Sequence, residues 1–128
     1  MQRCTDKAYW RAVHVCFALS IMSAMADNLP DPVEAGWRGQ RVCETLSEGA
    51  EIRVFRCTFP PGVGHERHFH PKHFGYALSG GTMRIADATG TRDASLQTGS
   101  YFSSEGIAWH EVLNIGDTVV SYLMIEPK

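Results

Sequence analysis

The sequence predicts an all-β domain, a sandwich or barrel built from short strands. Short runs of alternating apolar and polar residues recur along the chain, and residues that favour turns separate them. No segment after Asp27 combines an apolar stripe of helical period with capping residues. The chain has 128 residues, of which 44% are hydrophobic, and this length allows one core of ordinary size but not two.

The first 26 residues differ from the rest. Three basic residues precede an apolar stretch over residues 12–22, and Ala24-Met25-Ala26 follows it. This layout is typical of a secretory signal peptide, which would make the protein periplasmic or secreted. Two alternatives stay open: translation that begins at a later methionine, giving a cytoplasmic protein, or a helix packed on the domain. We therefore expect residues 1–26 to lie outside the barrel and residues 27–128 to form a single domain.

The rest of the chain begins with an extended linker over residues 28–32, because two prolines there interrupt regular structure. In the expected strand over residues 51–59, Arg53, Phe55, Cys57 and Phe59 share one face. The polar residues 87–93 are expected to form a turn. The full set of expected strands covers residues 41–46, 51–59, 65–70, 74–78, 82–86, 95–96, 101–102, 108–113 and 119–125.

Composition and charge exclude several classes of protein. The formal net charge is -2 and no long basic run occurs, so we expect no nucleic-acid partner. No apolar stretch reaches the roughly 18 residues of a membrane span, so we do not expect an integral membrane protein. Cys43 and Cys57 lie on neighbouring expected strands and could pair in an exported protein. Two buried thiols are the favoured interpretation, because the cysteines show no CxxC spacing.

Histidine clustering is the main chemical signal in the sequence. Six histidines occur, and four of them fall within residues 65–73. His68 and His70 are two residues apart, so on a strand both imidazoles point to the same face. His110 lies about forty residues later, on another expected strand, with Trp109 on the opposite face and Ala108 beside it. Two ligands from one strand and one from another could hold a metal ion, and imidazole nitrogen favours transition metals over Mg²⁺ and Ca²⁺.

The spacing around these histidines resembles the two signatures of the cupin superfamily, G(X)5HXH(X)3,4E(X)6G and G(X)5PXG(X)2H(X)3N. Gly62 followed five residues later by His68-Phe69-His70 matches the first, and Gly99, His110 and Asn114 match the second. The resemblance implies a small single-domain protein with a double-stranded β-helix, or jelly-roll, barrel. It also implies that His68, His70 and His110 bind a divalent transition metal, which could be Fe, Mn, Ni or Zn.

One departure from the first signature decides the fourth ligand. The metal-binding Glu is missing, and counting three residues past His70 puts Phe74 in its place. Alignment on Gly80 instead puts His73 there, with a deletion of one residue. We predict His73 as the fourth ligand, because an imidazole can coordinate a metal and a phenyl ring cannot.

Two further polar residues are candidates for a place near the metal. Glu66 has the strand parity of His68 and His70, so it could point inward as a base or as a partner of a ligand. Arg53 and Arg56 lie on opposite faces of one strand, and one of them could hold a carboxylate, although exposed charges are the simpler interpretation.

The resemblance leaves two classes of function open. One is a metal-dependent enzyme that acts on a small organic molecule, with oxygenase (dioxygenase), isomerase or lyase chemistry. The other is a non-catalytic module that binds or senses a small molecule or a metal. The sequence identifies no catalytic residue beyond the predicted metal ligands. The resemblance also implies a homodimer.

Overall fold

The computed structural model describes residues 28–128, and in this part of the chain all regular structure is β. The signal-peptide hypothesis for residues 1–26 lies outside the described residues. The strands are β1 (Gly36–Trp37), β2 (Gln40–Arg41), β3 (Cys43–Glu48), β4 (Ile52–Phe59), β5 (Gly64–His70), β6 (His73–Ser79), β7 (Gly81–Asp87), β8 (Gly90–Leu96), β9 (Tyr101–Ser104), β10 (Ile107–Asn114) and β11 (Val120–Pro127).

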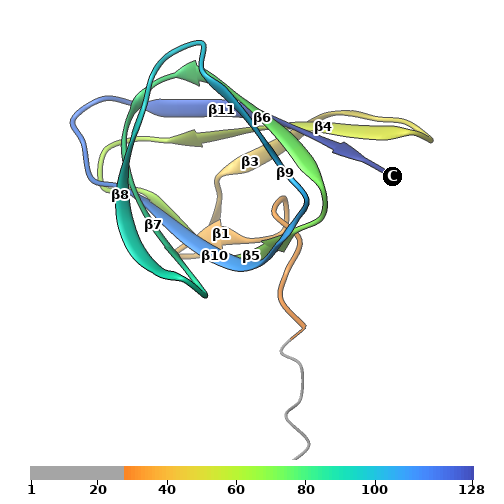
Figure 1. The fold of residues 1–128 in the computed structure, drawn as a ribbon, viewed down its shortest axis with the longest axis horizontal. Helices are drawn as coiled ribbons and strands as arrows, with labels where there is room; N and C mark the ends of the chain where they lie inside the picture. Colours follow the sequence, from red (N-terminus) through yellow and green to blue (C-terminus); the bar gives the residue numbers. More distant parts are fainter. Residues whose placement is uncertain (1–27) are drawn as a thin grey trace, which may run out of the picture.

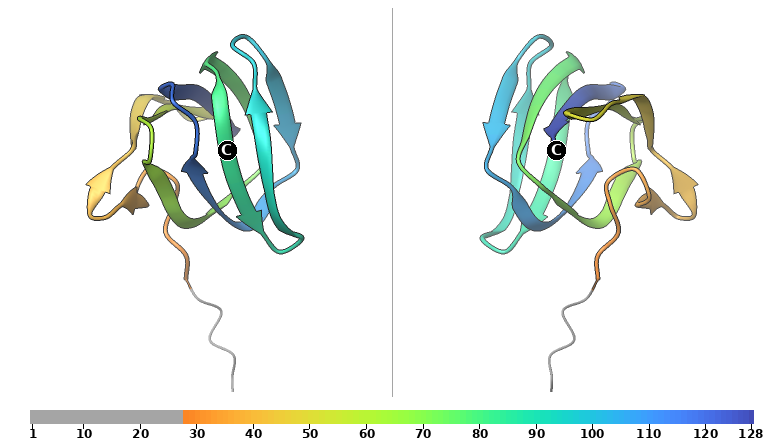
Figure 2. Two further views of the ribbon diagram at one scale, coloured as in Figure 1. Left: turned by 90° about the vertical axis from the view of Figure 1, so that its left-hand side faces the viewer. Right: turned by 90° about the vertical axis from the view of Figure 1, so that its right-hand side faces the viewer.

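Two antiparallel sheets enclose the interior of the domain. One contains five strands in the order β3-β4-β11-β6-β9, and the other contains four in the order β5-β10-β7-β8. β1 and β2 form a separate two-stranded ribbon. Figures 1 and 2 show the two sheets curving around a common centre. The predicted all-β jelly-roll barrel is therefore confirmed.

The core lies between the sheets, and alternation along β4 explains how it forms. Phe55, Cys57 and Phe59 are buried on the inner face of β4, with exposed fractions of 0–1%. They pack against Met83 of β7 and Met124 of β11. The sequence predicted this inner face of β4, because apolar residues at every second position favour a strand buried on one side.

The polar turn that the sequence predicted over residues 87–93 is too long. β7 continues to Asp87 and pairs it with Gly90, so the turn contains only two residues and β8 begins directly after it. β8 is an edge strand of the four-stranded sheet, and its residues from Gly90 to Asp93 are exposed. An exposed edge strand can carry polar residues on both faces. The polar run over residues 87–93 therefore resembled a turn in the sequence.

A disulfide joins Cys43 of β3 to Cys57 of β4. The two residues are direct partners in the antiparallel pairing of these strands, and both are buried. The interpretation as two buried thiols, which the sequence favoured, is therefore wrong. Pairing register decides this contact, because it brings the two sulfur atoms to the same place on the inner face.

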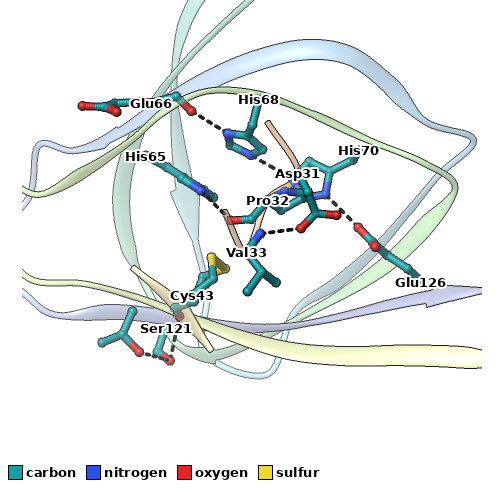
Figure 3. The surroundings of a disulfide bond; sticks show 12 residues. Asp31, Pro32, Val33, Cys43, His65, Glu66, His68, His70, Ser121 and Glu126 are labelled. Atoms are coloured by element: carbon teal, nitrogen blue, oxygen red, sulfur yellow. Dashed lines mark hydrogen bonds and ion pairs between the residues drawn. A yellow bond between two sulfur atoms is a disulfide. The ribbon is translucent and has the colours of Figure 1, made fainter. Parts of the chain in front are cut away.

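The segment predicted as an extended linker packs against the barrel. Pro32 is fully buried, and a turn follows in which the Ala35 amide donates to the Asp31 carbonyl at 2.8 Å. Figure 3 shows Asp31 and Pro32 beside the interior histidines. Separately, within residues 28–128 no helix has the length and apolar character that a membrane crossing requires.

Candidate metal centre

The pairing of β5 with β10 brings three of the four predicted ligands together. His110 of β10 is the direct partner of His68 of β5, and Ile107 is the partner of His70. His68 and His70 are buried, with exposed fractions of 0% and 5%, and His110 is partly buried. Three imidazoles from two adjacent strands therefore converge at one point inside the barrel.

The ring nitrogens of these histidines have the spacing of metal ligands. The Nε2 atom of His68 lies 3.0 Å from Nε2 of His70 and 2.9 Å from Nε2 of His110. Two nitrogens that each lie about 2.1 Å from one ion at a right angle are about 3.0 Å apart. The donor atoms of this group therefore fit a single transition-metal ion.

Hydrogen bonds on the far side of two rings determine which nitrogens carry protons. His68 donates from Nδ1 to the backbone carbonyl of Glu66 at 2.6 Å, and a carbonyl can only accept. His70 donates from Nδ1 to the Glu126 carboxylate at 3.2 Å. In neutral rings the two Nε2 atoms then carry lone pairs that face each other. A cation between them would satisfy both lone pairs, which supports the fit of the site to a metal.

Burial keeps the three imidazoles neutral. It is the largest cause of the low pKa values at this site, followed at His70 and His110 by repulsion from neighbouring histidines. The pKa falls to about 2 at His70 and at His110, and it is also lowered at His68. Neutral imidazole is the form that coordinates a metal, so these rings are in the ligating state at neutral pH.

His73, the predicted fourth ligand, lies next to the group but is not part of it. Its side chain is buried, its ring centroid lies 4.7 Å from that of His70, and Nδ1 donates to the Pro71 carbonyl at 2.8 Å. Among residues 28–128, the histidine nitrogens that all lie within 4.8 Å of one another are those of His68, His70 and His110. Phe74, the alternative in the sequence alignment, points outward and stacks on Tyr101, so it is His73 that faces the interior.

The side chain of Glu66 does not point toward the histidines, contrary to the expectation from strand parity. It is exposed, and Figure 3 shows its carboxylate directed away from the histidines. This carboxylate accepts a hydrogen bond from the Arg38 amide at 2.9 Å. The cause is an irregularity in β5: His68 pairs with His110, but His65 pairs with Val112, so one strand advances by three residues and the other by two. This bulge turns His65 inward instead, which parity along an unbroken strand could not reveal.

A second irregularity in the same pairing affects β10. His70 pairs with Ile107 while His68 pairs with His110, so β10 advances by three residues between these positions. Ala108 is exposed as a result and does not share the inner face with His110 as expected. Trp109 does lie on the outer face, where the Arg67 guanidinium sits 3.9 Å above its ring.

His65 is the fifth histidine of this interior. Its Nε2 donates to the Pro32 carbonyl at 2.9 Å, and its ring stacks on His68 with centroids 3.7 Å apart. A ring nitrogen of His65 also lies within 4.8 Å of the sulfurs of Cys43 and Cys57, but the disulfide occupies both sulfur atoms. In this structure His65 therefore supports the His68 ring from behind.

Glu126 is the residue near the site that the sequence reasoning missed. It lies on β11 with only 3% of its surface exposed, and it contacts both His70 and Arg53. Its position shares parity with Tyr122 and Met124 on the inner face of β11, and this parity was the available signal. Burial raises the pKa of Glu126, and hydrogen bonds from Arg53 oppose the rise.

Arg53 points inward and binds two carboxylates, whereas Arg56 is exposed and pairs with Glu44. The interpretation of both arginines as exposed charges is therefore wrong for Arg53. Burial raises the pKa of Asp31, but hydrogen bonds from Arg53 and from the Val33 amide outweigh this and hold it below its ordinary value.

Comparison with known proteins identifies the family and the fold of the chain. The family model for the cupin domain matches residues 55–126. A cupin domain from Bordetella pertussis Tohama I has a TM-score of 0.64 at 22% identity, covering 68% of this chain and 92% of that one. The polyketide cyclase RemF from Streptomyces resistomycificus has a TM-score of 0.55 at 17% identity, covering 66% and 65%. An RmlC-like cupin family protein from Methanocaldococcus jannaschii has a TM-score of 0.55 at 12% identity, covering 67% and 78%.

At these identities the solved structures show a shared fold and nothing of the reaction. No curated protein matches the sequence. The family model covers more than half of the chain, and the histidine group lies within the matched residues. The chain therefore belongs to the cupin domain family, as a monocupin with a histidine group that could hold a metal ion.

Proposed function

We propose that this monocupin binds one divalent transition-metal ion through His68, His70 and His110, and acts on a small organic molecule. The observation that carries the proposal is the convergence of three Nε2 atoms, with neighbours 2.9 and 3.0 Å apart, in a buried site. Because all three ligands are neutral nitrogens, we expect a transition metal rather than Mg²⁺ or Ca²⁺, and the resemblance to cupins implies Fe, Mn, Ni or Zn.

His73 enters the proposal as a fourth ligand. Its Nδ1 is held by the Pro71 carbonyl, which leaves Nε2 as the nitrogen that can coordinate. A bound ion would supply the Lewis-acid or redox chemistry of a dioxygenase, isomerase or lyase. The protein residues would hold the ion, fix the orientation of its ligands and exclude water from the barrel.

A specific observation favours a second candidate, a non-catalytic binding or sensing module. Glu126 and Asp31, the two carboxylates next to the histidines, are both bound to Arg53. Neither is therefore available as a general acid or base without breaking a partly buried ion pair.

Elemental analysis of protein purified without a metal-affinity tag tests whether the protein binds a metal ion. We expect one equivalent of a transition metal, and a higher melting temperature when Fe, Mn, Ni or Zn is added to protein freed of metal by a chelator. His110→Ala should abolish both effects. His65→Ala, which removes a more deeply buried ring that is not a ligand, should keep them. The absence of an ion together with an unchanged melting temperature would refute the proposal.

Turnover assays then separate the two classes of function. Candidate catechols, thiols and β-dicarbonyls are incubated with metal-loaded protein, with and without oxygen. Turnover that needs oxygen indicates a dioxygenase, and oxygen-independent turnover indicates an isomerase or lyase. Saturable ligand binding without turnover would favour the binding module.

A further inference from the structure

A series of hydrogen-bonded charged side chains connects His70 of the candidate metal centre to the segment before β1. Glu126 accepts a hydrogen bond from Nδ1 of His70 through one carboxylate oxygen. The other oxygen accepts from Nε and Nη2 of Arg53 at 3.1 and 2.5 Å. Nη2 of Arg53 also donates to Asp31 at 2.7 Å. Figure 3 shows Asp31, His70 and Glu126 side by side.

The sum of charges in this group is negative. Two carboxylates share one guanidinium, so the three side chains together carry one net negative charge next to His70. The first cupin signature normally places a carboxylate on the metal, and here Phe74 or His73 occupies that position. The negative charge that the ligand set lacks is thus found on the side chains that contact His70 from the side away from the site.

We infer that Glu126 positions the metal ligand His70, and that Glu126 and Asp31 together supply the negative charge that the histidine ligands lack. The inference rests on the proposed metal site. The acceptor on Nδ1 keeps the proton there, so Nε2 presents its lone pair to the ion. The net negative charge lowers the cost of burying a divalent cation among neutral ligands, because electrostatic interactions are weakly screened in the interior.

Arg53 links the two carboxylates in this arrangement. It offsets the repulsion between two carboxylates by pairing with both, and its guanidinium lies 5.1 Å from the centroid of the Phe55 ring. A purely structural ion pair between Arg53 and Glu126 would need only one carboxylate oxygen. The second oxygen is directed at His70, and this geometry points to a role at the metal.

Three variants separate charge from positioning. Glu126→Gln keeps the size of the side chain and removes its charge. Asp31→Asn removes the same unit of charge without touching His70. Glu44→Gln is the matched control, because Glu44 also pairs with an arginine of β4 but lies on the exposed outer face. Zinc affinity is measured for each full-length variant by competition with a chelator, and the melting temperature of the metal-free form is recorded in parallel.

We expect Glu126→Gln to weaken zinc binding by about 10- to 100-fold, the usual effect of changing a partner of a metal ligand. Asp31→Asn should weaken it by a smaller factor, and Glu44→Gln should leave it unchanged. Nitrogen NMR of the imidazoles gives a second readout in metal-free protein. His70 should carry its proton on Nδ1 in the wild type and in Asp31→Asn.

Unchanged zinc affinity in both Glu126→Gln and Asp31→Asn would overturn the charge role. A proton on Nε2 of His70 in the metal-free wild type would overturn the positioning role. If Glu126→Gln does not fold, unchanged zinc affinity in Asp31→Asn alone overturns the charge role, and NMR of the wild type still tests the positioning role. If the wild type takes up no ion, the proposed function and the charge role fail together, whereas the NMR measurement still decides positioning.

Discussion

The hydrogen-bond partners behind His68, His70 and His73 determine what each ring can do. His68 and His73 donate from Nδ1 to backbone carbonyls, and His70 donates to the Glu126 carboxylate. In each case Nε2 is the nitrogen left for a ligand. Backbone and carboxylate acceptors of this kind commonly set the tautomer of metal-bound histidines. All three rings therefore carry the proton on Nδ1 and a lone pair on Nε2.

The contribution of His73 can be measured directly. We expect His73→Ala to weaken metal binding without abolishing it, because the three converging nitrogens of His68, His70 and His110 remain. Metal titration of His73→Ala and His110→Ala side by side is the measurement. Equal affinity of His73→Ala and the wild type would remove His73 from the ligand set, and complete loss of binding would make it as essential as His110.

Among the elements, the connection between β10 and β11 depends on one side chain. Asn114 ends β10, is fully buried, and donates from Nδ2 to the carbonyls of Phe59 and Thr118 at 2.8 and 2.7 Å. Its Oδ1 accepts from the Gly116 amide at 3.0 Å. Asn114 thereby joins the end of β4 to the turn that leads into β11, the strand that carries Glu126.

We expect Asn114→Ala to lower the free energy of unfolding by about 3 kcal/mol, because three hydrogen bonds of about 1 kcal/mol each are lost. Urea denaturation of the metal-free protein measures this. Ser100→Ala is the control, since the Ser100 hydroxyl makes a single exposed hydrogen bond, to the Gln97 carbonyl. A loss below about 1 kcal/mol would show that water replaces the Asn114 contacts.

At the scale of the whole molecule, the buried histidines link stability to pH. Burial lowers the pKa of His65 to about 3, and burial with neighbouring imidazoles lowers those of His70 and His110 to about 2. The unfolded chain protonates these residues near pH 6.5, whereas the folded chain does not. Between these pKa values the unfolded state binds more protons, so stability falls as the pH falls.

We therefore expect the metal-free protein to lose stability between pH 7 and pH 5, by up to about 2 kcal/mol for each of these three histidines. Denaturant midpoints at the two pH values, measured after chelator treatment, give the change. A midpoint that does not move would contradict the low pKa values of the buried rings. The same comparison after metal loading should show a higher midpoint at pH 7 in the protein that binds an ion.

The homodimer stays a prediction. The outer face of the five-stranded sheet carries exposed apolar side chains, among them Tyr76, Leu78 and Tyr101 with exposed fractions of 39%, 40% and 72%. A second copy that covers this face would remove that area from water. Light scattering should give the mass of two chains for the wild type and of one chain for a Leu78→Asp, Tyr101→Asp double variant. A monomeric wild type would refute the prediction.

The sequence by itself determined the fold class and three of the converging residues. Apolar residues at every second position predicted the inner face of β4, and the HXH spacing predicted that His68 and His70 share one face of β5. Both predictions succeeded because side chains alternate between the two faces of a regular strand. His110 was predicted from its place on a second expected strand, the resemblance added its spacing, and the structure pairs it directly with His68.

Only the tertiary structure decided what depends on register between strands. The irregularities in the pairing of β5 with β10 turned His65 inward and left Glu66 and Ala108 exposed. Pairing of β3 with β4 joined Cys43 to Cys57. The closure of the barrel brought Glu126 and Asp31, 95 residues apart in sequence, to Arg53 behind His70. These contacts depend on bulges and on distant pairings, which strand parity in a single sequence does not encode.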